Sequence, residues 1–320
     1  MSKNPHKETD LRQLRVAYPA LAPVFENDPD LAALFKGRHF VLNIFDGGSI
    51  AANSILSASS VLLGQSGSGK TNGLAALLEE LANVGASFSC IDSEGDLYTV
   101  ADILKSVKVI EVKNAWHEED IYALALSTIQ GIERNIFTFT ATTTIEERRR
   151  FVLNYSKSLF EIADARYREG KAMPHLLVID EAHLYAAQQY SSADKWMQEL
   201  LFLFGNIASM GRKRGLGLLM ATTRAARLNK DILSQVRMRW LMRAVEPADI
   251  KSYRAALNSI DDPNVQWNII ASIPTLPIGC AIFVPDDGQG RPIKFRMRYS
   301  RHISTTPTME NYEKYGEKEV

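Results

Sequence analysis

The chain has 320 residues, and 46% of them are hydrophobic, which is enough to build a substantial core. Its 37 basic and 37 acidic residues give a formal net charge of zero, which excludes a general attraction to nucleic acid and leaves only local basic surfaces. Cys90 and Cys280 lie in apolar runs, as free thiols of a reducing compartment do, and no apolar run reaches the roughly 18 residues that cross a bilayer, so we expect a cytoplasmic protein without membrane insertion.

In chain order, residues 1–45 form a polar N-terminal extension with short helical patterns at 11–18 and 31–35. Strand-like runs then alternate with helical stretches. Strands are expected at 40–44, 60–63, 87–91, 107–112, 136–140, 176–180, 217–221, 240–243 and 281–284, and the main helices at 72–84, 145–169, 192–210 and 247–257. This alternation predicts a doubly wound, mostly parallel α/β sheet flanked by helices. We expect one core over 46–285, then a C-terminal strand and polar tail over 286–320.

A phosphate-binding loop follows the second of these strands. Residues 64–71 read GQSGSGKT and match the pattern G-x-x-x-x-G-K-[ST] between a strand and a helix N-terminus. The glycines let successive backbone N–H groups point at an anion, Lys70 supplies charge for the β- and γ-phosphates, and the Thr71 hydroxyl suits Mg²⁺. The sequence therefore predicts ATP with Mg²⁺ as ligands. The binding residues are expected to be Gly64, Gln65, Ser66, Gly67, Ser68, Gly69, Lys70, Thr71 and Asn72.

An acidic pair ends the strand expected at 176–180. The run LLVIDEAH at 176–183 is apolar up to Asp180 and Glu181, which fall at the carboxyl end of the strand, where ligands of such sheets bind. Asp180 is expected to hold Mg²⁺ with Thr71, and Glu181 to act as the general base that polarises the attacking water. His183 either couples this site to a neighbouring element or is structural. The acidic turn at 92–96 is either part of the same edge or an ordinary turn.

A basic block lies between residues 205 and 243. It holds nine basic residues against one acid, Asp231, which gives nine minus one, or +8, in a chain of zero net charge. Some of these arginines could act as fingers that stabilise the phosphoryl transition state of a neighbouring subunit, others could track nucleic-acid phosphates, and a plain solvated face is the third reading. A second basic cluster at 291–301 alternates with apolar residues, which predicts a strand with one apolar and one basic face.

Together these motifs resemble the HerA/FtsK superfamily of hexameric DNA-pumping ATPases, and the HerA-like group most closely. The likeness rests on GQSGSGKT (64–71), the strand and turn at 90–96, VIDEAH (178–183), and the block MGRKRGLGLLMATTR (210–224) followed by LNKDILSQV (228–236). It implies a RecA-like core that forms a ring with ATP at subunit interfaces and DNA in the channel. By the same resemblance, Arg212 is the trans finger, with Arg214 as the alternative. Thr223 replaces the family's sensor glutamine, and Ala225 replaces a proline.

These features predict an ATPase that drives DNA translocation or unwinding as a homo-oligomer, most simply a hexameric ring. A nuclease, capsid or effector protein could be its partner. The alternative is a nucleotide-gated scaffold or regulator of an effector, with little translocation, which the Thr223 departure favours. A small-molecule kinase fits less well, because an Asp-Glu pair suits hydrolysis coupled to work.

Overall fold

The computed structural model describes residues 41–301 apart from 57, 114–115, 132, 259, 261 and 286–287. The helical patterns expected at 11–18 and 31–35 and most of the C-terminal tail lie outside the described residues. Within them, a nine-stranded sheet has the order β11-β10-β9-β3-β8-β7-β4-β6-β5. Its strands are β3 (Ser59–Leu63), β4 (Ser87–Asp92), β5 (Val107–Val112), β6 (Arg134–Phe139), β7 (His175–Ile179), β8 (Leu216–Thr222), β9 (Met238–Met242), β10 (Cys280–Val284) and β11 (Arg291–Lys294).

The sheet is parallel from β5 to β9, and β10 and β11 extend it in antiparallel fashion beyond β9. Strands β3, β4, β7, β8 and β9 are buried along their whole length, as continuous apolar runs in a covered parallel sheet should be. This architecture confirms the predicted mostly parallel α/β fold. The strand expected at 40–44 is the exception, because β1 (Val41–Phe45) pairs with β2 (Gly48–Ala51) in a separate two-stranded sheet.

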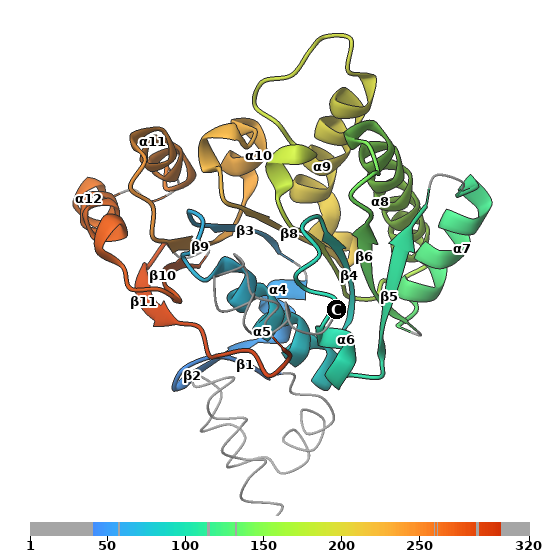
Figure 1. Ribbon diagram of the computed structural model, residues 1–320, viewed down its shortest axis with the longest axis horizontal. Helices are drawn as coiled ribbons and strands as arrows, with labels where there is room; N and C mark the ends of the chain where they lie inside the picture. The colour runs from blue at the N-terminus through green and yellow to red at the C-terminus, as the bar shows by residue number, and fades with distance from the viewer. Residues whose placement is uncertain are drawn as a thin grey trace, which may run out of the picture.

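Helices cover both faces of the sheet (Figure 1). The sheet divides the hydrophobic core into two clusters, one on each face. One face carries α4 (Ala52–Leu56), α5 (Lys70–Asn83), α6 (Val100–Ile103) and the β1–β2 ribbon. The other carries α7 (Glu118–Ile129), α8 (Ile145–Arg168), α9 (Lys195–Arg214), α10 (Lys230–Gln235), α11 (Pro247–Ala256) and α12 (Pro263–Ser272). Helix α8 begins with a capping box between Thr144 and Glu147, and α9 begins at the N-cap Asp194, whose side chain accepts from the Met197 N–H.

The expectation of a basic face and an apolar face at 291–301 is corrected by the structure. Only Arg291–Lys294 form a strand, and in the segment that follows the burial pattern is the reverse of a solvated basic face. Arg296 and Arg298 are buried, whereas the Met297 and Tyr299 side chains between them are 73% and 69% exposed. The reason is that the buried carboxylate of Glu79 on α5 pairs with Arg296, so burying this arginine does not leave its charge unpaired.

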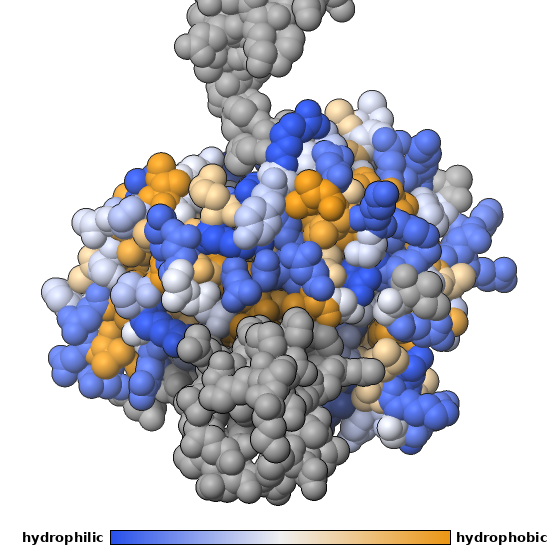
Figure 2. Space-filling model, turned by 90° about the horizontal axis from the view of Figure 1, so that it is seen from below, coloured by the Kyte–Doolittle hydropathy of each residue, from blue (hydrophilic) through white to orange (hydrophobic). Residues whose placement is uncertain are grey.

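Figure 2 shows the molecule from below the view of Figure 1, and on that face apolar side chains are interspersed among hydrophilic ones. Within the part of the chain that the structure describes, no helix is both long enough and apolar enough to cross a membrane.

Candidate nucleotide-binding site

The loop at 64–71 joins β3 to α5 at the carboxyl edge of the sheet and is tied to the strands on both sides. Gly64 donates its N–H to the Thr222 carbonyl of β8 (3.3 Å), and Gln65 donates to the Arg243 carbonyl just beyond β9 (2.9 Å). Because β9 and β8 are the two neighbours of β3, these bonds fix both sides of the start of the loop. At the crest, Ser66 and Gly67 are exposed.

The end of the loop forms the N-terminus of α5. Gly69 has a φ of 98°, and a Cβ there would lie 2.9 Å from the backbone nitrogen of Gly279, so glycine is required for conformation and for space. The first i→i−4 bond of the helix is donated by Gly73 to the Gly69 carbonyl. The amides of Lys70, Thr71 and Asn72 precede that bond, and their N–H groups and the helix dipole together suit a phosphate.

The Lys70 ammonium lies between the two acidic residues that follow β7. Its Nζ is 2.8 Å from Asp180 Oδ1 and 3.0 Å from Glu181 Oε1, and all three side chains are buried. Strand order explains the meeting, because β7 is separated from β3 only by β8 and both strands end at the same edge. Residues 110 positions apart in sequence therefore form one cluster, at the place where the sequence predicts the β- and γ-phosphates.

Glu181 is held in an unusual conformation. With a φ of 47° it is the one non-glycine residue of positive φ among the described residues. Its Oε2 accepts from the Thr223 N–H (3.2 Å) and hydroxyl (3.0 Å) and lies 3.1 Å from His183 Nδ1, which is also 2.9 Å from Thr222 Oγ1. The structure thus places Thr223, which the family resemblance predicts at the sensor position, against the carboxylate expected to be the general base.

The charges of this cluster shift the pKa of each member. Burial alone would lower the pKa of Lys70, but the neighbouring Asp180 and Glu181 carboxylates outweigh it and raise the pKa. Burial opposes ionisation of Glu181 as well, yet the His183 hydrogen bond and the Lys70 charge lower its pKa to about 2. For Asp180, burial dominates and raises the pKa, although Lys70 acts in the opposite direction.

The oxygen atoms around Lys70 suit Mg²⁺ bound together with a nucleotide. Magnesium in phosphate sites takes one or two protein oxygens and keeps water and phosphate oxygens for the rest. The Asp180 carboxylate and the Thr71 hydroxyl, next to Lys70 in the first turn of α5, supply such a set. Among the described residues no group of three or more His, Cys, Asp or Glu side chains could hold a metal without a nucleotide.

The acidic turn after β4 has a mainly structural arrangement. Both Asp92 carboxylate oxygens accept backbone N–H groups of the turn, from Gly95, Asp96 and Leu97 at 2.9–3.2 Å. Burial raises the pKa of Asp92 to about 6 despite those bonds. Strands β7 and β8 lie between β4 and β3, so this turn borders the acidic pair that follows β7 rather than the loop that follows β3.

The two candidate finger arginines lie far from the loop of their own chain. Helix α9 extends to Arg214, four residues past its expected end, and β8 begins at Leu216, so Arg212 and Arg214 lie at the amino edge of the sheet. Arg212 is exposed. Arg214 is not free, because its guanidinium pairs with Asp164 (2.6 Å) and lies over the rings of Phe160 and Tyr167.

Two other arginines of the basic block lie at the carboxyl edge beside the loop, and no motif in the sequence singles them out. Arg224 follows β8 and is exposed, and Arg243 follows β9 and has a buried Nε without a hydrogen-bond partner in the described chain. The signal that could have found them is positional: each comes directly after a strand that neighbours β3.

Known proteins share both the motifs and the fold. Residues 48–195 match the family described as "Helicase HerA, central domain". This segment holds both the phosphate loop and the acidic pair, so the part of the chain that forms the candidate site is similar to the HerA central domain. A probable DNA double-strand break repair helicase HerA of Methanocaldococcus jannaschii is 30% identical over 140 residues, which are 43% of this chain and 24% of the relative. The DNA double-strand break repair helicase HerA of Pyrococcus furiosus is 37% identical over 95 residues, 30% of this chain and 16% of the relative.

The chain thus spans about a quarter or less of the length of these HerA relatives. The structure of VirB4 from Thermoanaerobacter pseudethanolicus superposes with a TM-score of 0.54 at 12% identity and covers 85% of this chain and 98% of that one. At this identity the likeness concerns the fold alone, and it covers strands outside the 48–195 match.

Proposed function

We propose that the chain is an ATP-hydrolysing, ring-forming motor that translocates along or unwinds DNA. The observation that carries the proposal is the buried cluster of Lys70, Asp180 and Glu181 at the end of a HerA-type phosphate loop. A lysine ready for phosphates, a carboxylate for Mg²⁺ and a second carboxylate for water are the parts that phosphoryl transfer to water requires.

Nucleotide binding must rearrange this cluster. With the His183 hydrogen bond and the Lys70 charge both acting on it, Glu181 is a weak base, because its pKa of about 2 lies far from neutral pH. A triphosphate in the loop competes for the Lys70 ammonium. Once Lys70 turns to the phosphates, its charge stabilises the ionised Glu181 less and the pKa of Glu181 rises toward the range of a useful base. Occupancy of the loop thereby activates the base.

Magnesium completes the site in this proposal. Asp180 and Thr71 would hold the ion, which would supply positive charge beside the phosphate oxygens. Release of Asp180 from Lys70 frees the carboxylate oxygen that the ion needs.

The basic amino edge of the sheet supports phosphate contacts outside the loop. Ser59, Tyr167 and part of α9 line a depression of about 670 Å³ together with four basic residues, Arg212, Lys213, Arg214 and Arg237, and no acidic residue lines it. Such a surface suits either DNA phosphates or the triphosphate held by an adjacent copy. The names of the HerA relatives, which describe helicases of DNA repair, favour a role on DNA.

The test is ATP hydrolysis by the purified chain with and without duplex or single-stranded DNA. We expect hydrolysis that DNA stimulates, and a Glu181→Gln variant that binds ATP but turns it over at least 100-fold more slowly. If DNA neither binds nor stimulates the protein, the motor proposal fails. If Glu181→Gln still assembles and controls a partner while the wild-type protein does not move on DNA, the nucleotide-gated scaffold is correct instead.

A further inference from the structure

The order of strands gives the direction in which a nucleotide lies along the sheet edge. The acidic pair follows β7, on the β8 side of β3, so the terminal phosphate and the attacking water belong on that side of the loop. The nucleoside must extend from the loop toward the opposite side. There the chain returns after α12 to form β10 and β11, and two of its segments contact the loop and the first turn of α5.

The first contacting segment is the turn before β10. Gly279 donates its N–H to the Ser68 carbonyl at 2.8 Å, which joins this turn to the loop itself. The preceding residue, Ile278, is 64% exposed although its neighbours are anchored. An aliphatic side chain is thus presented to solvent beside the phosphate loop.

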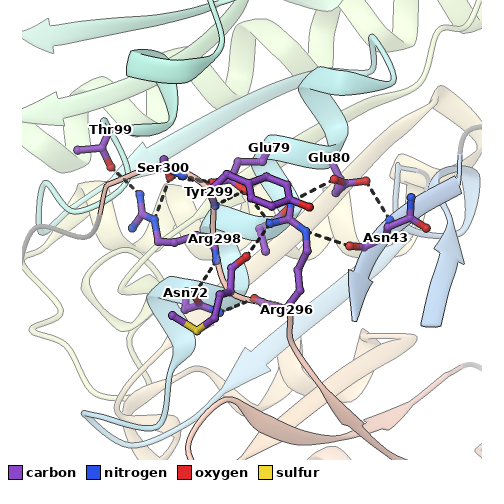
Figure 3. Close-up of polar contacts among 11 residues, drawn as sticks. Asn43, Asn72, Glu79, Glu80, Thr99, Arg296, Arg298, Tyr299 and Ser300 are labelled. Atoms are coloured by element: carbon purple, nitrogen blue, oxygen red, sulfur yellow. Dashed lines mark hydrogen bonds and ion pairs between the residues drawn. The ribbon is translucent and has the colours of Figure 1, made fainter. Parts of the chain in front are cut away.

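The second contacting segment follows β11 and lies along α5 (Figure 3). Asn72 donates its side-chain amide to the Arg296 carbonyl (2.8 Å) and accepts the Arg298 N–H (3.0 Å), so its side chain brackets Met297. The ring of Phe295 reaches within 3.2 Å of where a Gly73 Cβ would stand. Met297 is therefore fixed opposite the residue that follows the loop, and its side chain is 73% exposed.

Charge pairs beneath this segment keep Met297 facing outward. Arg296 bonds Glu79 (2.9 Å) and Glu80 (3.1 Å) on α5, and Glu79 also accepts the N–H groups of Tyr299 and Ser300. Figure 3 shows the arginine directed at these carboxylates, and its side chain is buried. Inversion of the segment would remove Arg296 from its buried partners, so the exposure of Met297 is built into the fold.

We propose that Ile278 and Met297 form the surface that receives the nucleobase of the triphosphate held by the loop. This inference rests on the proposed nucleotide-binding function and adds the part of the site that contacts the base. An aliphatic side chain and a thioether are suited to the flat faces of a heteroaromatic ring and do not read its hydrogen-bonding edge. Adenine and guanine nucleotides are therefore bound with similar affinity.

The experiment compares ADP with inorganic tripolyphosphate, which has the phosphates but no base. Dissociation constants of both are measured by calorimetry for the full chain and for Ile278→Ala and Met297→Ala. We expect ADP to bind about tenfold more weakly to each variant, and tripolyphosphate within about twofold of wild type. Tyr122→Ala on α7 at the far end of the sheet, where Tyr122 is 45% exposed, is the control and should change neither constant.

Unchanged ADP affinity in both variants would overturn the inference. An equal loss for ADP and tripolyphosphate would also overturn it, because it would show that these residues only position the loop. Neither readout involves DNA or hydrolysis, so the result does not depend on whether the chain proves to be a motor.

Discussion

Glu181 has a strained backbone conformation, and both of its carboxylate oxygens already have polar partners. A left-handed conformation at a non-glycine residue persists only where the surroundings impose it, and it is found preferentially at functional sites. Here one carboxylate oxygen faces Lys70 and the other faces Thr223 and His183. The residue in the best position to activate water is thereby held by three side chains before any nucleotide arrives.

Thr223 is expected to position Glu181 rather than to bind nucleotide. Replacement by valine removes the hydroxyl that bonds Glu181 Oε2 at 3.0 Å but keeps the shape of the side chain. We expect Thr223→Val to lower kcat about tenfold and to leave KM unchanged, because only the orientation of the base is lost. Steady-state ATPase assays check this, and Thr223→Ser should retain most of the rate. A raised KM at unchanged kcat would mean that Thr223 contacts the nucleotide directly.

What the sequence reveals about single residues depends on how local their signal is. The loop from Gly64 to Thr71 and the pair Asp180–Glu181 are contiguous motifs, so the sequence alone indicates them. The state of Arg214 could not be predicted, because its partner Asp164 lies 50 positions away on another helix. The place of Arg243 beside the loop could not be predicted for a similar reason, since only the strand order shows that β9 borders the loop strand.

The contact between the C-terminal segment and α5 is an ion-pair network that a single substitution can break. Arg296→Met leaves the carboxylates of Glu79 and Glu80 without their counter-charge, and Glu79 is fully buried. We expect a loss of about 3 kcal/mol in the free energy of unfolding, measured by urea denaturation. Lys294→Met is the matched control, because its ion pair with Asp46 is exposed and should contribute little. Equal stability of the two variants would contradict the proposed importance of the network.

Strands β4 and β7 share a buried histidine that makes the sheet sensitive to acid. His175 is fully buried between Ser87 Oγ (2.7 Å) and Ser89 Oγ (3.0 Å), and burial lowers its pKa to about 3. In the unfolded chain its pKa is about 6.5, so the unfolded state binds the proton first as pH falls. Titration of His175 therefore leaves the free energy of unfolding unchanged above pH 6.5 and lowers it below that pH, by about 2 kcal/mol at pH 5.

The measurement is the free energy of unfolding between pH 7.5 and 5 for wild type and His175→Gln. The variant should show a shallower decrease toward acid, since glutamine can bond the same serines without titrating. Asp92 acts in the opposite direction, because its raised pKa makes the folded state bind the proton first, but it is present in both proteins. Parallel pH profiles would show that His175 does not titrate on unfolding.

The sequence predicts helices and strands well where the pattern of apolar residues matches the pattern of burial. The buried strands around the loop and helix α8 lie within a few residues of their expected ranges. The segment after β11 was misread because alternation alone cannot show which face meets the core. In most proteins the apolar residues of such a segment face inward. Here Glu79 and Glu80 on the buried side of α5 pair with Arg296, so the basic residue faces inward instead. Helices α7 and α12 were not among the expected helices.

At the scale of the whole molecule, the functional residues lie at opposite edges of one sheet. The loop and the acidic pair lie at the carboxyl edge, and Arg212 lies at the amino edge, about 20 Å away along strands of this length. A side chain cannot cover that distance. If Arg212 takes part in hydrolysis, it must therefore do so in the site of another copy.

Mixing two inactive variants tests this arrangement. Lys70→Ala removes the phosphate-binding cation, and Arg212→Ala removes the exposed finger candidate, so each homogeneous assembly should hydrolyse ATP poorly. In a mixed assembly, some sites combine an intact Lys70 from one copy with an intact Arg212 from its neighbour. Random mixing at equal amounts makes about one site in four complete, so the mixture should recover up to about a quarter of the wild-type rate. Recovery requires subunit exchange, which native mass spectrometry can follow in the same sample. Full activity of Arg212→Ala alone would exclude this arginine, and no recovery despite mixed assemblies would exclude action across the interface.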